Sequence, residues 1–347
     1  MTSAVTIWAI ESYRAGETTQ ILGLAEGLQR ALGWAIATKG LHYTSLAGPA
    51  ALLRVISLAG VAPDTRKSLR PPWPDVLILA GARNEPVGRW VKCASGGRTL
   101  VVFLGRTGAS VRHFDLLVTT PQYRIKPAAN VLENSTTLHR VHAARLAGAK
   151  EEWRPLFAHL PGPLTVVLVG GDSGPFALRV ESARQLGAAL EQSRRNTGGT
   201  LLITTSSRTH PSAIDALAEA LPDAWLYRWR PNDPGNPYFG LLAWADGIVV
   251  TSDSIAMISE AQAVGVPVAL FDLSQHHDAT LKTRTYAWLM RLGPERLSRD
   301  IGIAHERMIA AGRIHRLGEP QQPLSGALQE DALARTVARI AELVAKK

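Results

Sequence analysis

The residues whose types and spacing best suit a binding site lie between Thr251 and Glu260, directly after the apolar run Gly247 to Val250. We expect a helix to begin near Asp253, where free backbone amides at the helix start favour an anion. Glu260 follows Asp253 by seven residues, about two helical turns, so it shares that face and leans back toward the helix start. This pattern suits a diphosphate at the helix start and ribose hydroxyls at Glu260, with an ordinary N-cap and a solvated glutamate as the alternative. The candidate contact residues here are Ser252, Asp253, Ser254, Met257 and Glu260.

Three further loops in the same half carry candidate groups. Gly170 to Gly174 follows the apolar run Leu164 to Val169, and its small residues would let backbone amides approach a phosphate, with a purely structural turn as the alternative. Arg208 follows Leu201 to Thr204 and could clamp a phosphate, unless it is solvated beside capping Ser and Thr residues. The stretch Asn236 to Phe239 is typical of a turn followed by a helix cap. It could line the pocket that holds the diphosphate and the ribose. The candidates from these loops are Gly170, Gly171, Ser173, Thr205, Ser206, Arg208, Asn236 and Tyr238.

The first half offers one loop suited to acid–base chemistry, directly after its first apolar run. Glu11 and Glu17 are the carboxylates of this loop, and either could deprotonate an acceptor hydroxyl unless it is merely solvated or capping. Arg83 and Arg106 end later apolar runs and could contact the acceptor or the phosphates, or simply lie on the surface. Adjacent side chains in His276-His277-Asp278 point apart, so we predict no metal site there. We also expect no cofactor, since the nucleotide sugar would be a substrate.

These loops are separated by alternating strand and helix patterns, which predict an α/β fold with doubly wound parallel sheets buried on both faces. The Pro-punctuated stretch from Trp153 to Pro163 divides the chain into similar halves, so we predict a first domain over 1–157 and a second over 163–327. A final amphipathic helix is expected over 328–347. The expected strands are Val5–Ile10, Val76–Ala80, Leu100–Leu104, Leu116–Thr119, Leu164–Val169, Leu201–Thr204, Trp225–Tyr227, Gly247–Val250 and Val266–Phe271, with a helix over Thr18–Leu32.

Composition narrows the class of partner. Lys and Arg outnumber Asp and Glu by 38 to 29, a formal charge of +9 that favours anionic partners, while the absence of nucleic-acid motifs predicts no nucleic-acid partner. We expect a cytoplasmic protein, because no leader or long apolar run is present. The basic stretch Thr65 to Pro74 is either a plain surface connection or a patch that touches anionic lipid. Cys93, the only cysteine, is expected to be a small buried residue.

The motifs taken together resemble a known family, the bacterial proteins grouped with the plant mitochondrial fission factor ELM and described as GT-B glycosyltransferases. The resemblance covers nearly the whole chain. It rests on Arg14-Ala-Gly16, Gln20, Leu22-Gly-Leu-Ala-Glu26, Ala80-Gly-Ala-Arg83, Phe114-Asp-Leu-Leu117, Asn130-Val131, Gly170-Gly171, Thr204-Thr-Ser206, Arg208-Thr209, Asn236-Pro-Tyr-Phe239, Ala245-Asp246, Val250-Thr251, Asp253-Ser254, Met257, Ser259-Glu260-Ala261 and Gly265-x-Pro267-Val268.

The resemblance implies two Rossmann-like domains facing a cleft, with the donor nucleotide in the second domain, Glu260 on its ribose, and the last helix returning to the first domain. The expected activity is metal-independent transfer of a sugar from a nucleotide diphosphate to an acceptor hydroxyl. The acceptor would be a glycan or glycolipid, with peripheral contact to the cytoplasmic face of an anionic inner membrane. Ser12, Tyr13 and Glu17 stand where the family has Asp, Gly and His, and Ser207 where it favours Arg. A non-catalytic nucleotide-binding or recruitment protein and a nucleotide-sugar epimerase are the alternatives.

Overall fold

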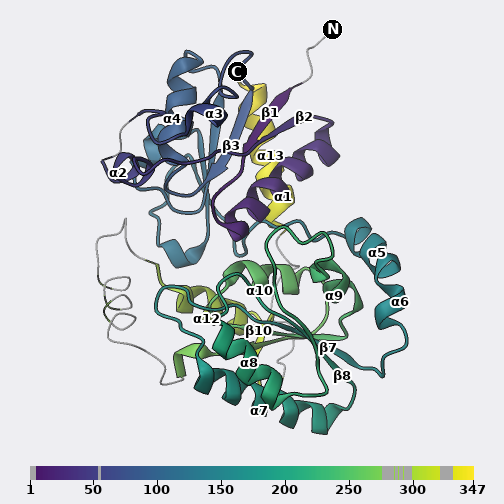
Figure 1. The fold of residues 1–347 in the computed structure, drawn as a ribbon. Helices are drawn as coiled ribbons and strands as arrows, with labels where there is room; N and C mark the ends of the chain where they lie inside the picture. Colours follow the sequence, from purple (N-terminus) through teal and green to yellow (C-terminus); the bar gives the residue numbers. More distant parts are fainter. Residues whose placement is uncertain are drawn as a thin grey trace. The chain divides into compact units, whose positions relative to one another are not determined.

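A computed structural model describes residues 5–53, 56–275, 299–320 and 331–347, together with Thr285, Trp288 and Leu292. The described residues divide into two compact units (Figure 1). Of the described residues, the first unit comprises 5–53, 56–140, 299 and 331–347, and the second comprises 141–275, 285, 288, 292 and 300–320. The predicted cluster His276-His277-Asp278 lies outside the described residues.

The first unit is built on a six-stranded sheet in the order β2-β1-β3-β4-β5-β6, in which every pair is parallel. The predicted strands of this half are confirmed, and β2 and β6 are additional edge strands. The strands are β1 (Thr6–Ile10), β2 (Ala35–Lys39), β3 (Val76–Ala80), β4 (Leu100–Leu104), β5 (Leu116–Thr119) and β6 (Val131–Glu133).

Successive residues of these strands are buried on opposite faces, as the period of two requires. Ile7 and Ala9 of β1 pack in one apolar cluster, whereas Trp8 and Ile10 pack in another. Helix α1 and helix α13 contribute to the first cluster, and α4 contributes to the second. The helices of this unit are α1 (Ala15–Leu32), α2 (Ala47–Leu52), α3 (Pro63–Arg66), α4 (Glu85–Ala94), α13 (Ala332–Ala345) and the 3-10 turns η1 (Val111–His113) and η2 (Pro121–Tyr123).

Helix α13 belongs to the core of the first unit although the second unit precedes it in sequence. It packs on α1, and its Val337 and Ile340 are buried in the same cluster as Leu24 of α1. The Asn134 amide nitrogen, after β6, donates to the Thr336 hydroxyl at 3.0 Å. The apolar core on this face of the first sheet is therefore complete only when the last helix of the chain packs on it.

Helix α4 corrects one expectation about burial. Cys93 is exposed on this helix, not buried, because Val87 and Val91 form the stripe that faces the sheet.

Trp73, which follows the basic residues near α3, is packed between Trp8 and Trp90, with ring centroids 5.8 and 5.9 Å away.

The second unit repeats the architecture with a six-stranded sheet in the order β12-β11-β10-β7-β8-β9, again parallel throughout. Its predicted strands are confirmed, and β12 is a further short edge strand. The strands are β7 (Leu164–Leu168), β8 (Thr200–Thr204), β9 (Trp225–Tyr227), β10 (Gly247–Thr251), β11 (Val268–Phe271) and β12 (His315–Arg316).

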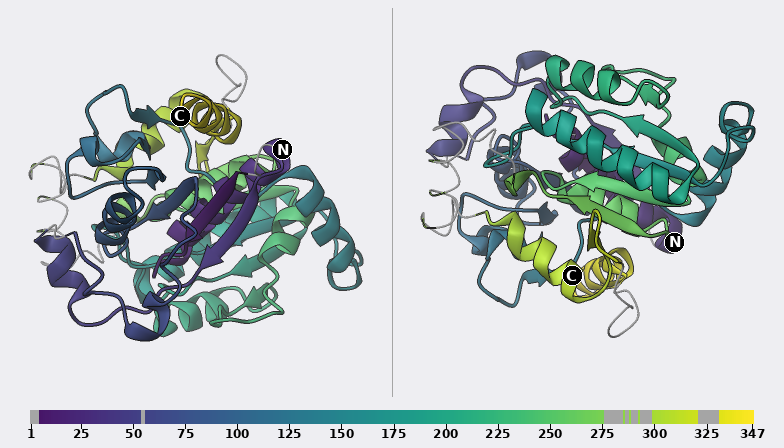
Figure 2. Two further views of the ribbon diagram at one scale, coloured as in Figure 1. Left: turned by 90° about the horizontal axis from the view of Figure 1, so that it is seen from above. Right: turned by 90° about the horizontal axis from the view of Figure 1, so that it is seen from below.

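Helices α7 and α8 pack side by side over the second sheet (Figure 2). The helices of this unit are α5 (Ala143–Glu152), α6 (Arg154–Phe157), α7 (Val180–Thr197), α8 (Pro211–Ala220), α9 (Tyr238–Trp244), α10 (Ile255–Gln262), α12 (Ile301–Ala310) and the 3-10 turn η3 (Leu273–Gln275). Helices α5 and α6 belong to this unit and not to the first half in which the sequence placed them, because α5 packs on α9 and Trp153 fills the space beside Gly240.

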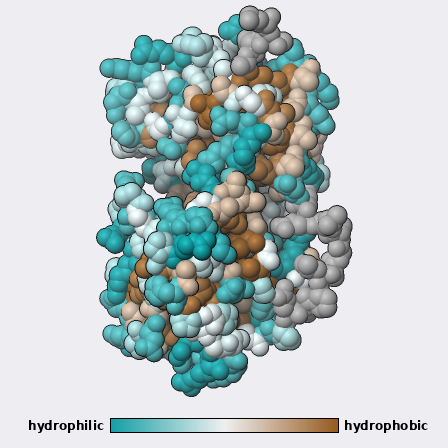
Figure 3. All heavy atoms as spheres, turned by 90° about the vertical axis from the view of Figure 1, so that its right-hand side faces the viewer, coloured by the Kyte–Doolittle hydropathy of each residue, from teal (hydrophilic) through white to brown (hydrophobic). Residues whose placement is uncertain are grey.

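The surface mixes hydrophilic and hydrophobic side chains on the face shown in Figure 3. The large apolar side chains with the greatest exposure in the first unit flank α2: Leu52 is 81% exposed and Leu53 is 73% exposed. In the part of the chain that is described, no helix combines the length and the apolar character needed to cross a bilayer.

Candidate functional site

Asp253 is the centre of a hydrogen-bond network at the carboxyl edge of the second sheet. It follows β10 and is 0% exposed. Its Oδ2 accepts from the Gly171 amide at 3.0 Å and lies 2.8 Å from the Arg208 guanidinium, while its Oδ1 accepts from the Thr251 hydroxyl at 2.7 Å. Burial raises the pKa of Asp253, and Arg208 and the two hydrogen-bond donors oppose that rise. The carboxylate thus joins the ends of β7, β8 and β10.

Gly170 and Gly171 are glycines because other groups occupy the space of a side chain. A Cβ on Gly170 would lie 2.2 Å from the Asp253 carboxylate, and one on Gly171 would lie 2.1 Å from the Arg208 carbonyl oxygen. The Gly170 amide donates to the Thr251 hydroxyl at 2.8 Å. Both amides are bonded within the unit and do not face a phosphate as the sequence suggested. The half-buried side chain of Ser173 is the group of this turn that remains for a ligand.

The loop after β8 is held by its own hydroxyl groups. Thr205 accepts from the Trp229 amide at 2.9 Å, and the Ser206 hydroxyl donates to the Gly170 carbonyl at 3.0 Å. The Thr209 hydroxyl also donates to the Gly170 carbonyl. This loop presents Arg208, whose side chain is 36% exposed while it pairs with Asp253. The guanidinium is therefore accessible to an anionic ligand from a fixed position.

Helix α10 begins just after Asp253, as expected, but the alternative that made Asp253 its N-cap is wrong. Ser254, not Asp253, is the N-cap, and its hydroxyl accepts from the Met257 amide at 3.5 Å. Ser252 is fully buried and accepts from the Leu273 amide at 3.0 Å, so its hydroxyl ties β10 to the end of β11. Met257 is partly buried against the core of the unit. Because Ser254 caps α10, the Asp253 carboxylate is available to bond groups at the ends of the neighbouring strands.

Glu260 on α10 and Tyr238 on α9 form a hydrogen-bonded pair in which Glu260 is buried and Tyr238 is partly buried. The Tyr238 hydroxyl donates to Glu260 Oε2 at 2.5 Å, and Glu260 is 6% exposed. Burial, followed by the charge of Glu260, raises the pKa of Tyr238 well above its ordinary value of 10.0. Asn236 caps the turn before α9, since its side-chain oxygen accepts from the Tyr238 amide at 3.1 Å. Asn236 positions Tyr238, and Tyr238 orients the carboxylate that the sequence assigned to a ribose.

His305 on α12 lies against the same edge of the second sheet. It is 6% exposed and is linked to the backbone of Ser252. Burial lowers its pKa from 6.5 to about 4, with Arg316 acting in the same direction and Asp272 opposing it. The imidazole is therefore neutral at physiological pH.

The two candidate bases of the first unit point to different places. The Ser12 hydroxyl donates to Glu17 Oε2 at 2.5 Å, and a Cβ on Gly81, after β3, would lie 2.4 Å from that same oxygen. Glu11 instead lies beside Gly40, after β2, where its Oε2 would be 3.3 Å from a Cβ. Arg83 stacks over the Tyr13 ring at 4.5 Å. The Glu17 carboxylate therefore lies at the end of β3, which the exposed Arg83 follows, whereas the Glu11 carboxylate lies at the end of β2.

Two residues that hold this site together, Thr251 and Thr209, were not among the candidate contact residues, although both lie in segments that the sequence analysis named. Both are buried hydroxyls bonded to the Gly-Gly turn. Their position at or just beyond strand ends was the available signal, but only the fold places them against Gly170. Over the residues that the structure describes, no group of three or more His, Cys, Asp or Glu side chains is arranged to hold a metal ion.

Solved structures that are similar in fold include a glycosyltransferase and a UDP-GlcNAc 2-epimerase. The chain aligns with a glycosyltransferase from Rickettsia africae at a TM-score of 0.50 and 10% identity, covering 99% of this chain and 100% of that one. It aligns with the UDP-GlcNAc 2-epimerase from Methanocaldococcus jannaschii at a TM-score of 0.51 and 13% identity, covering 98% and 100%. The fold is therefore the α/β GT-B fold, which glycosyltransferases and epimerases share.

Sequence relatives carry the family assignment. The chain is 28% identical over 232 residues to the mitochondrial fission protein ELM1 of Arabidopsis thaliana, which covers 60% of this chain and 54% of that protein, so it spans about half of that relative's length. It is 25% identical over 299 residues to an uncharacterized protein of Rickettsia prowazekii, covering 76% of this chain and 82% of that one. The family model described as Mitochondrial fission ELM1 matches residues 15–344, and the chain belongs to that family.

Proposed function

We propose that this chain is a glycosyltransferase that moves a sugar from a nucleotide diphosphate to an acceptor hydroxyl. The observation that carries the proposal is the hydrogen-bonded Tyr238–Glu260 pair, in which Glu260 lies seven residues after Asp253, the centre of the network that includes Arg208. Solved proteins of the same fold include Staphylococcus aureus MnaA with UDP and an epimerase of Neisseria meningitidis bound to UDP-GlcNAc. The GT-B fold and this pair together support a nucleotide-sugar donor.

In this proposal the second unit holds the donor. Glu260 accepts from ribose hydroxyls, and Tyr238 keeps its carboxylate in place. Arg208 and the start of α10 meet the charge of the diphosphate, with contacts from the Ser173 and Ser254 side chains. The proposal assigns no metal ion to this role.

The first unit supplies the base. The acceptor oxygen attacks the anomeric carbon, the bond from that carbon to the diphosphate breaks, and the diphosphate leaves with the electron pair. The acceptor proton passes to Glu17, whose carboxylate is held by Ser12 at 2.5 Å and Arg14 at 3.4 Å. Glu11 is the second candidate base.

Calorimetric titration with UDP, GDP, ADP and CMP tests the donor site. We expect one nucleotide to bind, and Glu260→Ala to weaken it at least about tenfold, the cost of losing hydrogen bonds to a charged group. Glu219→Ala is the matched control, because this exposed glutamate lies on α8 of the same unit. No binding of any nucleotide to the folded chain would refute the proposal.

Turnover separates the proposal from its two rivals. A glycosyltransferase releases free nucleotide only when donor and acceptor are both present, and Glu17→Gln should abolish that release while Glu11→Gln should not. A non-catalytic member of the family would bind nucleotide without consuming any donor. An epimerase would convert the donor sugar with no acceptor added.

We further propose that the acceptor is a glycan or glycolipid at an anionic membrane surface. Leu46, Leu52 and Leu53 are exposed around α2, and the exposed cations Arg66 and Lys67 follow in the same unit. Sedimentation with phosphatidylglycerol vesicles should retain the chain, and neutral vesicles should retain less. The double change Leu52→Asp and Leu53→Asp should release it, whereas Leu156→Asp in the second unit should not.

A further inference from the structure

Three loops meet at the carboxyl edge of the first sheet, where β2, β1 and β3 are neighbours in the sheet order. Tyr43 comes from the loop after β2, Tyr13 from the loop after β1, and Arg83 from the loop after β3. The Arg83 guanidinium carbon lies 4.5 Å from the centre of the Tyr13 ring and 5.9 Å from the centre of the Tyr43 ring. The two rings meet edge to face, with their centroids 6.5 Å apart. Three separate loops therefore hold one cation against two aromatic rings.

Asn84 anchors this arrangement. It is 0% exposed, and its amide nitrogen donates to the Glu11 carbonyl at 3.1 Å and to the Ala80 carbonyl at 2.9 Å. Its side-chain oxygen accepts from the Tyr43 hydroxyl. The backbone next to Arg83 and the Tyr43 ring are thus fixed by the same buried amide.

Arg83 is the cation of this edge that has no carboxylate partner. It is exposed, and it forms no ion pair with any residue that the structure describes. Glu17, in contrast, accepts from the Ser12 hydroxyl at 2.5 Å and faces Arg14 at 3.4 Å. Burial raises the pKa of Tyr43, Arg83 lowers it, and Glu17 adds to the rise, so both charges lie close to that hydroxyl.

The way in which Arg83 is held determines what it can bind. A guanidinium that packs over an aromatic ring uses its flat face, and its N–H groups remain in the plane of the cation. Those N–H groups match the paired oxygens of a carboxylate or a phosphoryl group. A carboxylate of the protein would have occupied them, whereas two tyrosine rings do not.

We propose that Arg83, held by Tyr13 and Tyr43, binds a carboxylate or phosphoryl group of the acceptor, which is therefore an acidic or phosphorylated sugar. An acceptor bound in this way brings its hydroxyls to the same sheet edge as Glu17. That the anionic group belongs to the acceptor rests on the proposed function. Binding of an anionic sugar at Arg83 does not, because all the groups involved lie in the first unit.

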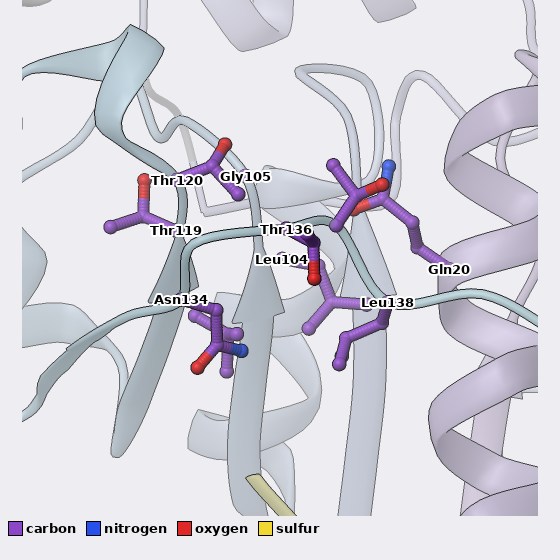
Figure 4. A pocket seen from close by; sticks show the side chains of 10 residues that line it. Gln20, Leu104, Gly105, Thr119, Thr120, Asn134, Thr136 and Leu138 are labelled. Carbon is purple, nitrogen blue, oxygen red and sulfur yellow. The ribbon is translucent and has the colours of Figure 1, made fainter. Parts of the chain in front are cut away.

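The cavity at the ends of β4 and β5 is a separate feature of this sheet (Figure 4). Its lining includes Gly105, Thr119 and Asn134, and it has room for about one water molecule. A sugar does not fit there. The binding surface that we propose is the exposed one around Arg83.

The test compares methyl glucuronide, methyl glucoside 6-phosphate and methyl glucoside, which share a ring and differ in the charged group. Saturation-transfer NMR titrations on the full chain, without nucleotide, measure their affinities. We expect at least one charged glycoside to bind at least about tenfold more tightly than methyl glucoside, because hydrogen bonds between charged groups are the stronger ones. The carboxylate and phosphate arms show which of the two anions the surface prefers.

Substitutions of Arg83 test the assignment of the contact. Arg83→Gln should weaken binding of the charged glycoside at least about tenfold. Arg83→Lys keeps the charge but loses the planar fork, so it should weaken binding by about threefold. The control is Arg30→Gln, an exposed arginine in the last turn of α1, at the opposite end of that helix from Glu17, and its affinity should be unchanged. Thermal melting should show all three variants folded, since Arg83 is exposed and unpaired among the described residues.

Three results would each overturn the inference: no binding of either charged glycoside, equal binding of the neutral glycoside, or equal affinities of Arg83→Gln and Arg30→Gln. Should Arg83→Gln fail to fold, Arg83→Lys supplies the same comparison. Nucleotide release then separates this inference from the proposed function. Release that is as fast with neutral as with charged acceptors would refute the inference alone, whereas charged-glycoside binding by a chain that binds no nucleotide would refute glycosyl transfer alone.

Discussion

The carboxyl edges of the two sheets are built in opposite ways. At the second edge the buried polar side chains are tied to one another: Asp253 has three bonding partners, and Thr251 bonds both Gly170 and Asp253. At the first edge Thr119, Thr120 and the oxygen of Asn134 are equally buried, yet they have no partner among the described residues.

The two edges therefore differ in whether their buried polar side chains have hydrogen-bond partners. The second edge gains rigidity from its network and presents the partly exposed Arg208. At the first edge, buried hydroxyl and amide oxygens lack partners among the described residues, and a buried polar group without a partner costs stability. We therefore expect substitutions in the network to reduce stability strongly, and loss of the unpartnered hydroxyls at the first edge to cost little stability.

The largest effect should come from Gly171→Ala. The new Cβ would meet the Arg208 carbonyl oxygen at 2.1 Å, and backbone cannot easily give way. We expect the free energy of unfolding of the second unit to fall by about 3 kcal/mol. Gly148→Ala is the control, because nothing lies within 4 Å of that helical site, and it should stabilise slightly. Equal chemical-denaturation midpoints for the two variants would contradict a rigid second edge.

Acid should weaken the second unit through His305. Its pKa is about 4 in the folded chain and near 6.5 when unfolded, so the unfolded chain binds more protons between those values. Stability should therefore fall by about 3 kcal/mol as the pH drops from about 6.5 to 4. Urea titrations across this range measure the slope, and His305→Gln should flatten it. A slope that persists in the variant would place the titrating group elsewhere.

Thr251→Val should have an intermediate effect. It removes the acceptor of the Gly170 amide and one donor to the buried Asp253 carboxylate, for a loss of about 2 kcal/mol. The same change at Thr120 should cost nothing, because that hydroxyl has no partner among the described residues. Denaturation of the two variants side by side compares the edges directly, and an equal loss would erase the distinction between them.

Gly81→Ala should have the smallest effect on stability. Its Cβ would approach Glu17 Oε2 at 2.4 Å, but a carboxylate end can move, and the remaining cost of about 1 kcal/mol comes from a φ of +86°. The displaced Glu17 should lose its bond to Ser12 and, with it, transfer activity. Thermal melting and nucleotide release measured on one sample test both parts; unchanged release would remove Glu17 from the proposed reaction.

Much of the fold followed from the sequence because the central strands are continuous apolar runs. β3 and β4 are buried at every position, and their predicted bounds match the structure. The strands that were missed, β2, β6 and β12, all lie at sheet edges. β2 is largely exposed and the other two are very short, so none leaves an apolar run to detect.

The site was predicted less completely, for a different reason. The sequence located the candidate loops, but hydrogen bonding depends on which loops the sheet order brings together. β7 lies between β8 and β10, so the Gly170 turn meets Thr251 and Asp253 from 81 and 82 residues away. Local spacing around Asp253 suggested an anion at a helix start, with a helix cap as the alternative, and only the sheet order shows the partners of its carboxylate.

The contribution of α13 to the first sheet limits how this chain can be divided. A fragment that stops at Arg140 would lack Val337 and Ile340, would expose Leu24 to water, and would leave the amide of Asn134 without Thr336. Proteolysis between the units would therefore not yield a stable first half unless the terminal helix stayed bound to it. To study that half alone, α13 would have to be supplied as a separate peptide or joined ahead of β1 by circular permutation.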